Sequence, residues 1–159
     1  MAFVFKTHQD LYELIQKINT KFYIPCCENI IYLEEICDEN AIAYIISLRD
    51  SYSHLVKIYE VNDITTHDNK SKIERQLERY SGHLERLLFD TFQKIISIKS
   101  HELWSQLSEK DKPAIKSQVA LEIKNLRIVA DESTTDQKIE GYKKIIDLIE
   151  DIFNKFIKN

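Results

Sequence analysis

The sequence predicts an all-α protein: a single domain, residues 1–159, built as an antiparallel helical bundle of about five or six helices. The chain has only two glycines and two prolines, whereas sheet-rich folds use many glycines in tight turns. Apolar residues recur at helical spacing almost from end to end, and no stretch alternates convincingly with period two. Short polar connections between these segments favour antiparallel packing of successive helices.

Two helices are expected before residue 37. In THQDLYELIQKINTKFY, Thr7 can serve as the N-cap, and apolar residues follow at helical spacing: Leu11, Leu14, Ile15 and Ile18. Pro25 is expected to interrupt the helix, because proline lacks the N–H and its ring clashes with the preceding turn. The stretch CENIIYLEEIC then predicts a short second helix.

A third helix is expected to begin at an Asp38 or Asn40 cap and to reach about Val61. Its apolar stripe, which predicts the side that faces the core, consists of five residues: Ile45, Leu48, Tyr52, Leu55 and Tyr59. The polar stretch NDITTHDNKSK that follows predicts a loop.

The fourth helix is predicted to run from about Lys70 to about Leu107. One apolar stripe continues over its whole length: Ile73, Leu77, Leu84, Leu88, Phe92 and Ile95. Gly82 is a weak point at which this helix could bend.

Two further helices complete the chain. SEKDKPAIKSQ, with Pro113 in a first-turn position, predicts the start of a fifth helix that reaches about Ala130. After DESTTDQK, either Thr135 or Asp136 is expected to cap a last helix with apolar positions Ile139, Tyr142, Ile146, Ile149 and Phe153.

The composition and charge of the chain indicate which classes of protein are expected and which are not. A net charge of −4 argues against a protein that coats nucleic acid without specificity, because such proteins are usually basic. Cys26, Cys27 and Cys37 lack Cys-x-x-Cys spacing, so we expect reduced thiols with packing roles. The apolar patch at the start is too short for a signal peptide and nothing later approaches a membrane span, so we expect a cytoplasmic protein without a membrane partner.

The candidate catalytic residues are Arg49 and His54, in SLRDSYSHLVKIYE of the expected third helix. They point about 140° apart on a helix. His54 falls nearly opposite the apolar stripe, so the pair is expected to face solvent, a partner or a second copy. Histidine can move a proton near neutral pH and arginine can hold phosphate oxygens, so the two residues could carry out acid–base chemistry at a phosphate without metal. Asp50 could accept a hydrogen bond from His54 and hold one tautomer.

An Arg-x4-His element on a helix of a small all-α domain resembles the signature of the HEPN superfamily. The resemblance implies a HEPN-like fold and a metal-independent ribonuclease, often a toxin or antiviral effector. In that family the active site typically forms where two protomers, or two domains, bring their Arg and His elements together. Arg49 would then stabilise the charge that develops on the phosphate, and His54 would act as general acid or base. The implied partners are a second copy, an RNA substrate, and an antitoxin or other protein.

A different interpretation of the same residues is an exposed polar face with a routine Asp50–His54 or Arg49–Ser53 contact. The chain would then be a non-catalytic helical interaction or dimerisation domain. A nuclease would place two Arg49–His54 faces around a cleft across a two-fold axis. A pure interaction module would leave His54 in open solvent or bury it against apolar residues.

A second cluster of polar residues lies in IERQLERYSGHLERLLFD of the expected fourth helix. Arg75, Arg79 and Arg86 fall within a narrow arc with His83 beside them, and such a basic ridge can guide a phosphate backbone. The alternative is a solvated face in which interleaved glutamates neutralise the arginines. If the third and fourth helices are neighbours, this ridge borders the Arg49–His54 surface.

No cofactor or metal is expected. Di-iron carboxylate bundles need inward Glu-x-x-His motifs, but Tyr80 and Ser51 stand three positions before His83 and His54. There is no Gly-rich phosphate loop, no nucleophile elbow and no kinase element. Trp104 is expected to be a core anchor near the end of the fourth helix, or else the hot spot of a dimer.

Overall fold

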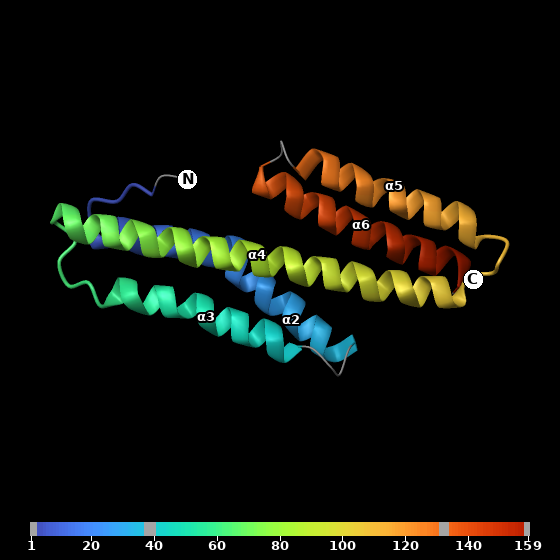
Figure 1. Cartoon of the computed structure of the whole chain (residues 1–159), viewed down its shortest axis with the longest axis horizontal. Coiled ribbons are helices and arrows are strands. Elements are labelled where there is room, and N and C mark those ends of the chain that lie inside the picture. The colour runs from blue at the N-terminus through green and yellow to red at the C-terminus, as the bar shows by residue number, and fades with distance from the viewer. Residues whose placement is uncertain (1–2, 37–40, 131–133, 158–159) are drawn as a thin grey trace. The chain divides into compact units, whose positions relative to one another are not determined.

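The computed structural model describes residues 3–36, 41–130 and 134–157, which form helices and no strand (Figure 1). The all-α prediction is therefore confirmed. The described residues contain six α-helices, and a π-helical segment joins the first two into one continuous run. The chain clusters into two compact units, Met1–Thr91 and Phe92–Asn159. The single domain over residues 1–159 stays a prediction.

The first unit begins with α1 (His8–Ile18), the π-helical segment η1 (Asn19–Tyr23) and α2 (Ile24–Ile36). The Thr7 cap is confirmed: its side chain accepts from the Asp10 backbone N–H, and the Asp10 carboxylate accepts from the Thr7 N–H.

The expected interruption at Pro25 is wrong, because the helix continues from α1 through η1 into α2. The backbone N–H of Ile24 donates to the Asn19 carbonyl, five residues back, which marks a widened π-helical turn. Directly after this turn Pro25 lies in the first turn of α2, where a missing N–H and a bulky ring are tolerated.

The helix α3 (Ala41–Tyr59) buries a different face from the one predicted. Its buried residues are Ala41, Ser51, Leu55 and Ile58, whereas Ile45, Tyr52 and Tyr59 of the predicted stripe are exposed. Ser51 tolerates burial because its hydroxyl donates to the Leu48 carbonyl at 2.6 Å. The predicted caps, Asp38 and Asn40, lie outside the described residues.

The helix α4 (His67–Gln106) begins inside the predicted loop and passes through Gly82 without a break. Thr66, a cap that the sequence prediction missed, accepts from the Asn69 backbone N–H at 3.4 Å. All six residues of the predicted apolar stripe are buried, so that part of the prediction is confirmed. In the first unit, α3 and the first part of α4 run antiparallel (Figure 1).

The second unit contains the end of α4 with α5 (Lys112–Ala130) and α6 (Thr135–Phe156). Its buried core is mainly aliphatic: Ile96, Leu103, Leu107, Ile115, Val119, Ile145, Ile149 and Ile152. Pro113 lies in the first turn of α5, as predicted. Neither Thr135 nor Asp136 caps α6; Thr134 does, with an extended backbone and reciprocal bonds to Gln137.

None of the helices in the described ranges has the length and apolar character needed to cross a membrane.

Candidate functional site

The structure brings together two histidines that the sequence placed in separate clusters. The rings of His54 on α3 and His83 on α4 stack with centroids 5.1 Å apart and planes inclined by 20°. The basic ridge of α4 therefore borders the surface of α3 that carries His54. All residues of this site belong to the first unit.

His54 is held by a hydrogen bond from its own ring to α4. Its Nδ1 lies 2.8 Å from Oε1 of Gln76, whose side chain is buried. With the amide oxygen as acceptor, Nδ1 carries the proton and Nε2 remains the basic nitrogen. The bond fixes the orientation of the imidazole, and in the tautomer with Nδ1 protonated Nε2 can act as a general base.

The sequence had suggested Asp50 as the orienting partner of His54, and Gln76 was missed. A signal for Gln76 was present, because this polar residue lies in the apolar stripe between Ile73 and Leu77. The expectation that His54 lies nearly opposite the core is also wrong. Because α3 buries a different face, His54 is half-buried against α4.

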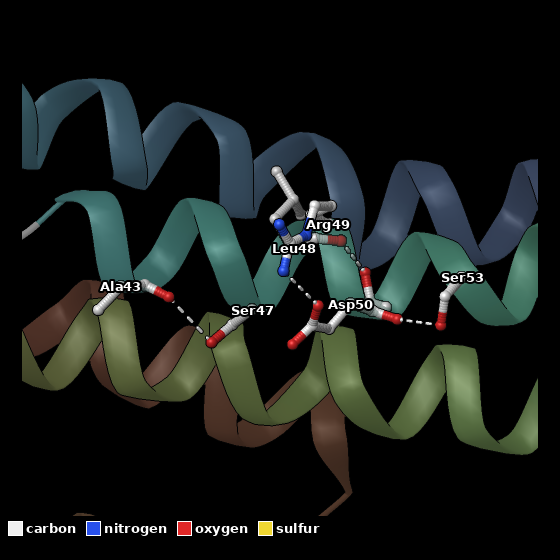
Figure 2. A network of polar contacts seen from close by, with 7 residues as sticks. Ala43, Ser47, Leu48, Arg49, Asp50 and Ser53 are labelled. Carbon is white, nitrogen blue, oxygen red and sulfur yellow. Dashed lines mark hydrogen bonds and ion pairs between the residues drawn. The ribbon is translucent and has the colours of Figure 1, made fainter.

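Arg49 and Asp50 form an exposed ion pair on α3 (Figure 2). The guanidinium and the Asp50 carboxylate are 3.2 Å apart, with side chains 74% and 61% exposed. Such an exposed pair contributes at most about 1 kcal/mol, so Arg49 can exchange Asp50 for another anion at little cost.

The contacts of the hydroxyls around Arg49 are local to α3. Ser53 donates to the Asp50 carbonyl at 2.7 Å, which replaces the Arg49–Ser53 contact of the alternative interpretation. Ser47 donates to the Ala43 carbonyl (Figure 2). Within the described part of the chain, the guanidinium of Arg49 pairs with Asp50 of the same helix turn and does not join His54.

The surroundings of His83 are cationic on balance. Although His83 is exposed, partial desolvation of its ring lowers its pKa first, and the nearby His54, Arg86 and Arg79 lower it further. Asp50 of α3 acts on the same pKa in the opposite direction. Arg79 and Arg86 of the predicted ridge thus act on the pKa of His83, and all three arginines of the ridge, Arg75 included, are exposed.

An apolar stripe of α3 is exposed around Arg49. Ile42, Ile46 and Val56 are 72%, 44% and 49% exposed, and Ile45 and Tyr52 continue the same face. These residues and Arg49 fall within an arc of about 120° on the helix. The sequence did not indicate this stripe, because Ile45 and Tyr52 belong to the pattern that was predicted to face the core. Apolar side chains grouped this way on a surface are typical of an interaction site.

The described residues contain no group of three or more histidine, cysteine, aspartate or glutamate side chains that could hold a metal ion. Two imidazoles flanked by guanidinium groups can nevertheless bind a phosphate and transfer a proton. Comparisons with protein-family models, with curated proteins and with solved structures gave no significant match.

Proposed function

We propose that this chain is a HEPN-like, metal-independent endoribonuclease of the kind that acts in toxin or defence systems, and that it acts as a homodimer. Arg49 and His54 are its catalytic residues. The observation that carries the proposal is the fixed His54 imidazole, held by Gln76 beside His83 and the cationic Arg79 and Arg86.

In the proposed reaction, the ribose 2′-oxygen attacks the adjacent phosphorus, and Nε2 of His54 takes the 2′-hydroxyl proton. The 5′-oxygen leaves with a proton from an imidazolium, and the products are a 2′,3′-cyclic phosphate and a 5′-hydroxyl. Arg49 neutralises the charge of the phosphorane through its planar guanidinium. Arg79 and Arg86 guide the incoming backbone, as phosphate-binding arginines do.

The dimer supplies what one copy lacks. Arg49 lies in the exposed apolar stripe of α3, while His54 points toward α4. A second copy packed on this stripe would bury Ile42, Ile46 and Val56 and gather both Arg49 side chains near the two-fold axis. Because His54 points about 140° away from Arg49 on α3, each active site would form where the edge of this interface reaches the His54 side of the helix.

Cleavage of a mixed RNA pool in the presence of a chelator tests the proposal. The wild type is expected to produce 2′,3′-cyclic phosphate ends, and Arg49→Ala and His54→Ala should each lower the rate by at least about 100-fold. His67→Ala is the matched control, since His67 is exposed at the start of α4, outside the site. Equal cleavage by all four proteins, or none by the wild type, would refute the proposal.

A second candidate function is a non-catalytic interaction or dimerisation domain, which the exposed stripe of α3 favours by itself. Light scattering of Ile46→Glu and Val56→Glu, with the exposed Ser47→Glu as control, measures self-association. If the stripe variants are monomeric and lose an RNA cleavage that the wild type has, the dimeric nuclease is supported. Monomeric variants of a wild type that cleaves no RNA would support the interaction domain instead.

A further inference from the structure

The second unit contains a cleft that the proposed ribonuclease function does not use. Its volume is about 710 Å³, within the range of about 300–1,000 Å³ that is usual for small-molecule sites. Residues of α4, α5 and α6 line it, all of them within the second unit. Trp104, Val119, Ile123 and Ile145 give it an apolar wall.

The ionisable side chains in this lining are Lys116, His101 and Tyr142, and no carboxylate is among them. In a chain with a net charge of −4 this is unusual. A second cleft beside α5 and α6 has the opposite character, since Glu122, Asp136 and Glu140 line it. The first cleft therefore suits an anion, and the second does not.

A hydroxyl in the first cleft is left without a partner. The Ser100 Oγ is buried and makes no hydrogen bond, although Ser100 lines the cleft. Ser105, farther along α4, satisfies its hydroxyl by donating to the Glu102 carbonyl. A buried hydroxyl without a partner costs free energy, and an acceptor atom of a ligand would satisfy it.

The side chain of Lys116 lies beside the aromatic ring of Trp104 in the wall of the first cleft. Nζ of Lys116 lies 5.9 Å from the centre of the Trp104 ring, within reach of a cation–π contact. A ligand whose acid group binds Lys116 would therefore place the apolar part of the molecule along Trp104. We infer that this cleft binds small organic acids with an aromatic or aliphatic body, with Lys116 on the acid group and Ser100 donating to it.

Fluorescence of Trp104, the single tryptophan of the chain, reports binding directly. The probes are 3-phenylpropanoate and its uncharged amide, which have nearly the same shape, titrated to about 10 mM so that millimolar affinities are visible. The acid is expected to give a saturable change and to bind about 10-fold more tightly than the amide. Calorimetric titration provides the second measurement.

Three variants locate the site. Lys116→Met is expected to lower the affinity for the acid about 10-fold, while Lys144→Met, in the second cleft, leaves it unchanged. Ser100→Ala is expected to weaken binding several-fold without lowering the melting temperature, because the lost hydroxyl had no partner.

Equal affinity for acid and amide, equal effects of Lys116→Met and Lys144→Met, or no saturable change at all would each overturn the inference. RNA cleavage is not part of this test. The inference about the cleft and the proposed nuclease can therefore fail independently.

Discussion

The two units of the chain use different contacts to fix their helices. In the first unit, polar side chains pair across helices: His54 with Gln76, Asn19 with Tyr80, and Asn29 with Thr91. In the second unit, α5 and α6 pack through an aliphatic core with Gly141 against Leu126. Polar pairs between its helices, Gln93 with Tyr142 and Lys99 with Glu150, lie at exposed positions, and the buried Ser100 hydroxyl has no partner. Polar pairs need defined geometry, so they orient side chains, whereas aliphatic packing mainly supplies stability.

The largest effect is expected from the aliphatic core. Ile149 is 1% exposed in the core of the second unit, so Ile149→Ala should lower the free energy of unfolding by about 3 kcal/mol. Urea unfolding followed by Trp104 fluorescence measures it in that unit. Ile146→Ala, at a half-buried position, should cost clearly less. Equal costs would contradict the packing described for α6.

The loss of a polar contact is expected to have the next largest effect on the free energy of unfolding, and it can be compared between the two units. Tyr80 is fully buried, and its hydroxyl donates to Oδ1 of Asn19 in the π-helical segment at 2.7 Å. Tyr80→Phe should cost about 1–2 kcal/mol, because Asn19 loses its donor. Tyr142→Phe removes an exposed bond from Gln93 in the second unit.

The free energy of unfolding of both tyrosine variants can be measured by circular dichroism. We expect Tyr142→Phe to cost about 0.5 kcal/mol or less, because water can replace the lost bond. A smaller cost for Tyr80→Phe than for Tyr142→Phe would break the distinction between the units.

The two glycines have different surroundings, since one has free space beside it and the other is closely packed. A Cβ added at Gly82 meets nothing within 4 Å, so Gly82→Ala should stabilise the protein by about 0.5–1 kcal/mol through its helix propensity. A Cβ at Gly141 would clash with Cδ1 of Leu126 on α5. Gly141→Ala should therefore destabilise the protein by about 1 kcal/mol.

Thermal unfolding of the glycine variants gives the comparison, and the double variant Gly141→Ala/Leu126→Ala tests the cause. If the clash is responsible, Gly141→Ala should be less harmful in the Leu126→Ala background. Stabilisation by Gly141→Ala in the wild-type background would mean that α5 and α6 are not in such close contact.

The smallest effect is expected from the histidine pair, His54 and His83, on the pH dependence of stability. The pKa of His83 is lowered from its ordinary value of 6.5 by burial and by His54, Arg86 and Arg79, against the influence of Asp50. The unfolded chain therefore binds a proton more readily than the folded one. The stability is fully present above about pH 6.5 and decreases as the pH falls through the lowered pKa of His83.

Melting temperatures across this range should show a weaker pH dependence for His83→Asn than for the wild type. His67→Asn, at an exposed position, should leave the dependence unchanged. The same slope in all three proteins would contradict the lowered pKa of His83.

Local signals were sufficient for much of the fold. The continuous stripe from Ile73 to Ile95 predicted most of α4, because a single long apolar face has only one way to be buried. Thr7 and Pro113 marked helix starts through chemistry that acts within a few residues. Pro25 does not end the helix, because the neighbouring turn is widened into a π-helical turn. The rule that proline breaks a helix does not take such a turn into account.

The candidate site depended on tertiary structure. The sequence singled out Arg49, His54 and His83, but apolar residues occur all around α3, so its pattern did not determine which face is buried. Packing of α3 within the first unit buried Ser51, Leu55 and Ile58. That rotation turned His54 toward Gln76 and His83 and left the apolar side chains beside Arg49 exposed. Residue types thus determined the available chemistry, while helix packing decided which side chains meet, because burial is a property of neighbouring helices.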